Sequence, residues 1–176
     1  AGETVGGRYR HAAGHAMSDL WTWAVAVYAN APVAETLLAL QDDEDQSPPL
    51  LLWAAWARPD ADAAAAGAAC ARAWDSAAVR PLRQVRRALK QPPAGADAVA
   101  TEALRARVKA AELEAERLLL ASLEVIAQPR VGSPELTQAL TLTARAWSGT
   151  APTGLHALAA AIAAAEPGAA AGASRP

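Results

Sequence analysis

The segment that most constrains the fold is residues 102–126, which reads EALRARVKAAELEAERLLLASLEVI. Small and apolar side chains recur in it at alternating steps of three and four, which is the period of one face of an α-helix. The spacing therefore predicts a long amphipathic helix over residues 97–127, packed through that face. The predicted face consists of Leu104, Val108, Ala111, Ala115, Leu118, Ser122 and Val125, with Leu119 and Ile126 widening its C-terminal end.

Two leucines depart from this pattern. Leu113 and Leu120 lie seven residues apart and fall on the opposite side of the predicted helix. A helix with a single buried face would expose both of them. Two interpretations remain open: surface leucines or a contact within the chain, and a second packing face used by a dimer or a partner.

The rest of the chain is divided by proline, glycine and capping residues into further helical segments. No segment alternates with a period of two over a convincing length, so the sequence predicts an all-α, single-domain bundle of about six to eight helices. The opening segment is apolar around most of its circumference and is expected to be the central helix. The expected helices are 18–30, 32–42, 50–56, 60–78 with an interruption at Gly67, the basic helix 79–90 begun or kinked by Pro81, 97–127, and two short helices within 133–166.

The ends of the chain carry a different composition. Residues 1–17 are small and polar and are expected to be a disordered leader, and residues 167–176 are expected to be a flexible tail; the helical domain spans 18–166. The leader has no long apolar region, and no apolar run approaches the roughly 18–20 residues that span a bilayer. A single cysteine excludes an internal disulfide framework. We therefore expect a soluble, cytoplasmic protein.

Five segments form a pattern along the chain: LWTWAVAVYA (20–29), VAETLLALQD (33–42), LLLWAAW (50–56), VRPLRQVRRALK (79–90) and LRARVKAAELEAERL (104–118). In the order and spacing of these segments, the chain resembles a small proteobacterial family known only as a domain of unknown function, over residues 18–126. The resemblance implies no activity, catalytic residue or cofactor. The acidic and proline-rich stretch 42–49 and everything after Ile126 match the pattern poorly.

The basic helix 79–90 is the first candidate for a contact site. Its cations fall within one arc, beside an apolar stripe, and such a ridge is typical of a surface that binds phosphates, RNA or an acidic protein. The alternative is a solvated face paired with the acidic run 42–45 or with the glutamates at 112, 114 and 116. The candidate contacts on this helix are Arg80, Arg83, Arg87 and Lys90.

The six tryptophans are the second candidate, since the chain has no phenylalanine and only two tyrosines. In an alanine-rich protein such rings supply most of the bulky core. They also line ligand pockets, where the indole N–H orients the ligand. The candidate pocket residues are Trp21, Tyr28, Trp53 and Trp56, with the basic helix as an anion-binding rim.

Three functions follow as hypotheses. The first is a non-enzymatic helical binding or adaptor module that acts through a protein partner or self-association, with Leu113, Leu120 and the basic helix as contacts. The second is a carrier or enzyme with a tryptophan-lined apolar pocket. The third is RNA binding by the basic helix, which the net charge of −2 disfavours. We find no catalytic motif, and we predict no metal site and no cofactor.

Overall fold

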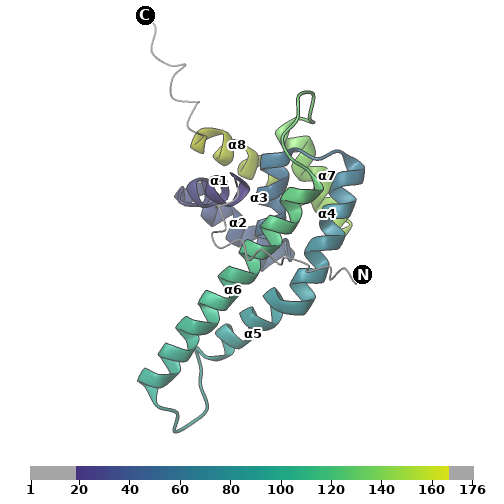
Figure 1. Ribbon diagram of the computed structural model, residues 1–176. Coiled ribbons are helices and arrows are strands. Elements are labelled where there is room, and N and C mark those ends of the chain that lie inside the picture. The colour runs from purple at the N-terminus through teal and green to yellow at the C-terminus, as the bar shows by residue number, and fades with distance from the viewer. Residues whose placement is uncertain (1–18, 167–176) are drawn as a thin grey trace, which may run out of the picture.

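The computed structural model describes residues 19–166, and every regular element in this range is a helix. The predicted all-α fold is therefore confirmed. The predicted leader, residues 1–17, and the predicted tail, residues 167–176, lie outside the described residues. The helices, shown in Figure 1, are α1 (Asp19–Tyr28), α2 (Ala31–Glu44), α3 (Pro48–Ala57), α4 (Ala61–Trp74), the π-helical turn η1 (Asp75–Val79), α5 (Arg80–Ala88), α6 (Ala98–Ile126), α7 (Leu136–Ser148) and α8 (Leu155–Ala165).

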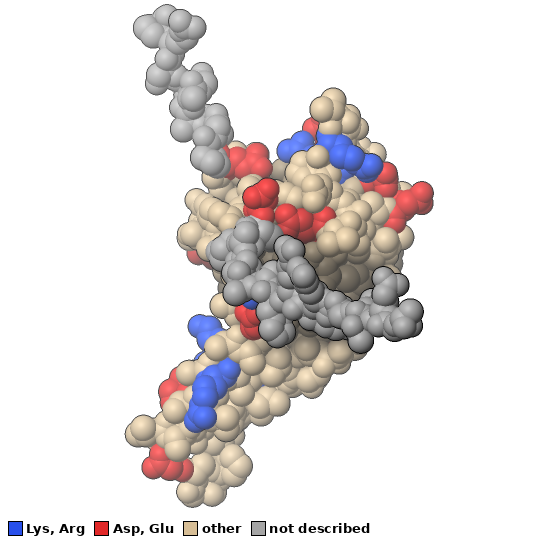
Figure 2. Space-filling model, in the orientation of Figure 1, with Lys and Arg blue, Asp and Glu red and all other residues tan. Residues whose placement is uncertain are grey.

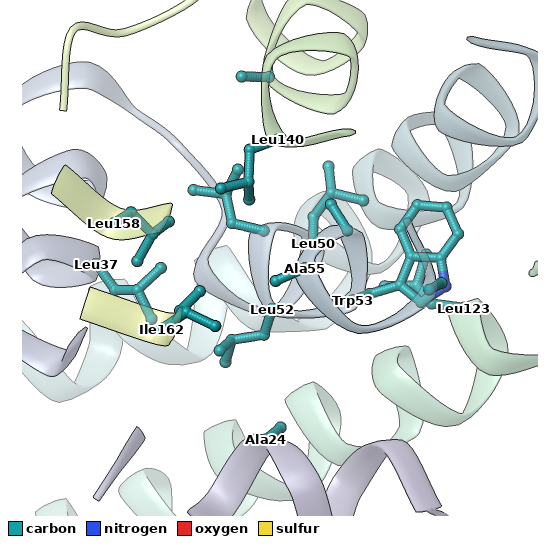
Figure 3. Packing of buried hydrophobic residues seen from close by; sticks show 14 of the residues in the cluster. Ala24, Leu37, Leu50, Leu52, Trp53, Ala55, Leu123, Leu140, Leu158 and Ile162 are labelled. Carbon is teal, nitrogen blue, oxygen red and sulfur yellow. The ribbon is translucent and has the colours of Figure 1, made fainter. Parts of the chain in front are cut away.

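The central helix is α3. Its sequence, PPLLLWAAWA, starts with proline in the first turn, where the missing N–H costs no hydrogen bond, and is apolar on all sides. All of its residues except Trp56 are buried. Figure 3 shows Leu50, Leu52 and Trp53 of α3 among side chains from several surrounding helices. A helix that is apolar around its whole circumference is stable in water only when it is surrounded in this way.

The expected place of α1 at the centre was wrong. Only Leu20, Ala24 and Val27 of this helix are buried, and they form one face. Its other apolar residues remain partly or largely accessible. The additional apolar residues of α1, which suggested a central helix, therefore lie outside its buried face.

The ring of Trp53 in α3 packs against the backbone of Gly67 in α4. Trp53 is fully buried, and its Nε1 donates a hydrogen bond to the Ala127 carbonyl oxygen at 3.2 Å. A methyl group at Gly67 would lie 2.6 Å from Cη2 of Trp53. The sequence predicted that Gly67 interrupts its helix, but α4 runs through it without a break. The glycine is present because the indole ring occupies the space of a side chain.

One π-helical turn joins α4 to α5. The turn ends in a hydrogen bond from the Arg80 backbone N–H to the Asp75 carbonyl oxygen, five residues earlier. Pro81 follows directly and has no N–H, and its ring would collide with the carbonyl of an uninterrupted α-helix. The wider turn relieves this conflict. The sequence prediction that Pro81 begins or kinks the basic helix is therefore confirmed.

Helices α5 and α6 form an antiparallel hairpin that extends from the body of the molecule toward the lower left of Figure 1. The predicted buried face of α6 was wrong for most of its residues, since Leu104, Leu118 and Val125 are exposed. Of the predicted face, only Ala115 and Leu119 are buried. The buried residues are centred about a quarter of a turn away from the centre of the predicted face. They are Glu112, Ala115, Leu119, Leu120 and Leu123. The first three turns of α6 bury no residue, because only α5 lies beside them.

Within residues 19–166, no single helix combines the length and the apolar composition of a membrane span. Helices α1 and α2 have this length and composition only when they are taken together, and they are bent by 98° relative to each other.

Candidate functional site

An open groove lies between α1, α2, the start of α3 and the α5–α6 hairpin. Its volume is about 660 Å³, and most of its accessible lining is apolar. The floor includes Pro48, Pro49 and Leu52 of the central helix, and Leu38 and Gln41 of α2 stand at its edge. Concave, mainly apolar surfaces with a few polar groups are the usual form of binding sites. We refer to this feature as the groove.

One wall of the groove is the outer face of α1. Trp21, Val25 and Tyr28 recur at steps of four and three, so they lie above one another on this helix. Val25 keeps 50% of its surface exposed and Tyr28 keeps 39%. These are the residues that made α1 look like a core helix in the sequence. The structure instead directs them into the groove.

The opposite wall is the side of α6 that carries Leu113 and Leu120. Both leucines line the groove, with Glu116 and Lys109 on the same side of the helix. Leu120 is buried at the inner end, whereas Leu113 is 52% exposed. The structure therefore brings together the two leucines singled out in the sequence and two of the predicted pocket aromatics, Trp21 and Tyr28.

A cluster of four charged side chains forms one end of the groove. Arg83 Nε donates to Glu112 Oε1 at 2.9 Å, and Arg83 Nη2 donates to Glu116 Oε1 at 3.1 Å. Arg86 Nε donates to Glu112 Oε2 at 2.5 Å. Glu112 is buried, and the other three side chains are between 16% and 24% exposed. The cluster fastens α5 to α6, and Figure 2 shows positive and negative side chains side by side on this hairpin.

The two glutamates have opposite pKa shifts. Burial acts to raise the pKa of Glu112, but the hydrogen bonds and charges of Arg86 and Arg83 outweigh it, and the pKa lies below its ordinary value. Burial raises the pKa of Glu116, and the charge of Glu112 adds to this rise while Arg83 opposes it. Burial and the charge of Glu116 also raise the pKa of Tyr28. The two arginines therefore favour the ionised form of Glu112, whereas burial disfavours that of Glu116.

We expect replacement of Glu112 by glutamine to change the pH dependence of stability. A carboxylate whose pKa is lowered by folding contributes stability above its unfolded pKa, about 4.3, and loses it as the pH falls through the folded value. The difference in unfolding free energy between wild type and Glu112→Gln should therefore be largest near neutral pH and shrink below about pH 4. Urea unfolding across this pH range measures it.

Glu116→Gln is the matched control, with the opposite sign. A carboxylate whose pKa is raised by folding costs stability when ionised, and this cost disappears as the pH falls through the raised value. The unfolding free energy of the wild type should therefore rise relative to that of Glu116→Gln as the pH falls. If the unfolding free energies of the wild type and both variants change with pH in parallel, the directions of the two pKa shifts are contradicted.

The other predicted site residues lie elsewhere. Trp53 belongs to the core and lines no part of the groove. Trp56 lines a second cavity on another side of α3. Arg80 pairs with Asp75 at 2.7 Å and with Asp45 at 3.4 Å, while Arg87 pairs with Asp42 at 2.7 Å. Lys90 is exposed at the end of the basic helix.

The sequence did not single out Glu112, Glu116 or Lys109 as site residues. The sequence offered the two glutamates only as possible partners of the basic helix, with no sign that Glu112 would be buried. The sequence could have indicated the two glutamates through the interpretation in which the basic helix pairs with acidic residues. Arg83, Arg86 and Arg87 do pair in this way, with partners from α6 and from the acidic run.

Between residues 19 and 166, no three His, Cys, Asp or Glu side chains are placed to hold one metal ion. Cys70 is half-buried, and burial raises the pKa of its thiol. A raised thiol pKa lowers the fraction of the reactive thiolate at neutral pH.

These features define a class of protein: an all-helical bundle with an open, largely apolar groove beside a projecting helical hairpin. The chain belongs to the family described as protein of unknown function (DUF2390), whose model matches residues 19–123. The described residues that line the groove all lie within the matched range, whereas α7 and α8 lie beyond it. No curated protein matches the chain, and no solved structure matches it.

Proposed function

We propose that this protein is a non-enzymatic binding module whose groove receives an amphipathic helical segment of a protein partner. The observation that carries the proposal is the meeting of two helical stripes in one groove. Trp21, Val25 and Tyr28 of α1 face the same hollow as Leu113 and Leu120 of α6. A helical ligand packs into such a groove through residues spaced by three, four and seven.

The exposure of the stripes supports this choice. Val25, Leu38 and Leu113 are each about half exposed, and all three line the groove. Large side chains of this kind, gathered into one hollow, mark interaction sites more often than isolated ones do. A docked helix would remove them from water, at roughly 25 cal/mol for each Å² of apolar surface.

The charged end of the groove supports binding more than catalysis. Arg83, Arg86, Glu112 and Glu116 are hydrogen-bonded to one another and hold the hairpin in place. A general acid or base needs a free position next to the reacting group, and Glu112 has both oxygens engaged. Lys109 at the rim offers a cation to an acidic residue of the partner helix.

The test begins with selection of peptides from a displayed library of the host's own proteins. We expect enrichment of amphipathic helical segments. Val25→Glu and Leu113→Glu should each weaken the selected peptide's affinity by about tenfold or more, because each buries a charge against an apolar helix face. Fluorescence anisotropy with the labelled peptide measures the change. Leu120 is avoided because it is buried and its replacement would disturb the core.

Leu104→Glu is the matched control. Leu104 lies on α6, is 45% exposed and does not line the groove. Its replacement should leave the affinity unchanged. Enrichment of no helical segment, or equal losses in all three variants, would contradict the proposal. If the enriched segment came from this chain, the partner would be a second copy, and the sedimentation mass should fall in Val25→Glu.

The groove volume favours one second candidate. A hollow of about 660 Å³ is within the range of small-molecule sites, and Trp21 and Tyr28 supply aromatic contacts. A carrier would retain its ligand through purification from its own host. Native mass spectrometry should then show a bound mass that Val25→Glu loses and Leu104→Glu keeps. The absence of any bound mass would count against the carrier.

The remaining parts of the proposal concern RNA and location. The arginines of the basic helix pair with acidic residues, which leaves less free charge for phosphates, so we do not favour RNA binding. The single cysteine favours the reducing cytoplasm as the site of action.

A further inference from the structure

A second cavity, of about 540 Å³, opens on another side of α3. Trp23 of α1 and Trp56 of α3 line it, together with the loop that joins α6 to α7. The loop forms the narrow projection at the top of Figure 1, and Figure 2 shows positive side chains beside it. The polar residues of the lining are Arg58, Arg130, Ser133 and Glu166.

The two tryptophans of this cavity differ from the structural ones. Trp53, Trp74 and Trp147 donate their indole N–H to Ala127 O, Ser122 Oγ and Asp45 O, respectively. Trp23 and Trp56 are only partly buried, and neither indole N–H has a partner within residues 19–166. Their faces and donors are therefore available to a ligand, as in pockets where indole rings hold an aromatic group.

Arg58 supplies the second observation. It ends α3 with a left-handed backbone, φ 48° and ψ 62°, at a position that glycine usually takes. A non-glycine residue in this conformation is strained, and Asp45 ends α2 with the same φ of 48°. No side-chain partner for Arg58 is found among the described residues. Arg58 therefore brings to the cavity lining a cation that no described acidic side chain pairs with.

The other charges leave the cavity net positive. Arg130 pairs with Asp60 at 3.4 Å, and both side chains are more than half exposed, so water weakens the pair. Ser133 Oγ donates to the Arg130 carbonyl oxygen and accepts from the Arg130 N–H, which fixes the turn. Glu166 is the one carboxylate among the described lining residues.

We propose that this cavity binds small aromatic molecules that carry a phosphate. The indoles of Trp23 and Trp56 would hold the ring, and the planar guanidiniums of Arg58 and Arg130 would bind the phosphate oxygens, which fit guanidinium in a two-point manner. This site is separate from the groove and from the partner proposed for it.

The test uses adenosine monophosphate and 1-naphthyl phosphate as probes, with adenosine and 1-naphthol as partners that lack the phosphate. Isothermal titration should show the phosphates binding at least about tenfold more tightly. Arg58→Gly should reduce that advantage by about tenfold and leave the neutral probes unchanged. Its thermal unfolding should be unchanged or shifted upward, since glycine relieves the backbone strain. A loss of affinity with an intact fold separates a ligand role from a structural one.

Two further variants locate the bound probe. Trp56→Leu should weaken both members of each pair, and Leu113→Glu, in the groove, should change neither. The proposal is overturned if the phosphates bind no better than their neutral partners, if Arg58→Gly keeps the full affinity, or if Leu113→Glu removes the binding.

Discussion

Replacement of Trp53 by alanine is expected to lower the free energy of unfolding by about 3–5 kcal/mol, the largest effect of any single substitution considered. Trp53 is fully buried in the central helix, so its loss leaves a cavity among Leu123 and the other core residues seen in Figure 3. The hydrogen bond from its Nε1 to Ala127, which ties the end of α6 to the core, is lost as well. Urea unfolding measures the change.

Trp56→Ala is the matched control on the same helix. Trp56 is only partly buried, so less apolar surface is exposed again when it is truncated, and the loss should be clearly smaller. Equal losses for the two substitutions would contradict the assignment of Trp53 to the core and Trp56 to a cavity wall.

The same assignment is tested by Gly67. Gly67→Ala should cost about 1–3 kcal/mol in the wild type, because the added methyl overlaps the indole of Trp53. In a Trp53→Leu background the overlap is relieved. There the substitution should become neutral or stabilising by up to about 1 kcal/mol, since alanine favours a helix over glycine. An unchanged cost in both backgrounds would contradict the contact.

Glu112→Ala is expected to have the second largest effect, a loss of about 2–3 kcal/mol. Removing one partner of a fully buried ion pair costs about 3–5 kcal/mol, because the remaining charge is left unpaired. Arg83 and Arg86 keep about one fifth of their side-chain surface in water, which reduces the cost here. The hairpin that forms one wall of the groove should loosen, and hydrogen exchange along α5 should accelerate.

Glu102→Ala is the control for this prediction. Glu102 is on the same helix and pairs with Arg105, but its side chain is 67% exposed. Its removal should cost only about 0.2–0.5 kcal/mol. Replacing Arg83, Arg86 and Glu112 together by leucine should recover part of the loss, since no charge then remains unpaired. Similar effects for Glu102→Ala and Glu112→Ala would show that the cluster is not held in a partly buried environment.

Much of the helix pattern was predictable from local signals. The predicted ends of the basic helix at Lys90 and of the long helix at residue 127 lie within two residues of the ends of α5 and α6. The third helix was predicted to begin at Leu50, but α3 begins two residues earlier, at Pro48. The buried face of α6 was not predictable. The prediction from the steps of three and four holds only if the same face of the helix is buried along its whole length. In the structure the first part of α6 packs only on α5, and the contact further along includes a buried glutamate. The ion pairs of Glu112 with Arg83 and Arg86 join residues far apart in the sequence, so they produce no periodic sequence pattern.

The site was predictable only in part, for a related reason. Leu113 and Leu120 stood out because they broke a pattern, and both line the groove. The sequence does not distinguish core tryptophans from groove tryptophans, since Trp21 and Trp53 are the same residue type and both lie in apolar segments. Which of them is core depends on which helix is surrounded on all sides, and that depends on how the other helices pack around α3.

The central claim is that the groove between α1 and α6 is where the protein binds its partner helix. Site-specific photo-crosslinking in the host cell tests this most directly, with a benzophenone amino acid at Val25 or, as control, at Leu104. We expect the Val25 position to give one discrete adduct, mapped by mass spectrometry to an amphipathic helical segment, and the Leu104 position to give none. An absence of adduct from Val25, or the same adduct from both positions, would contradict the claim.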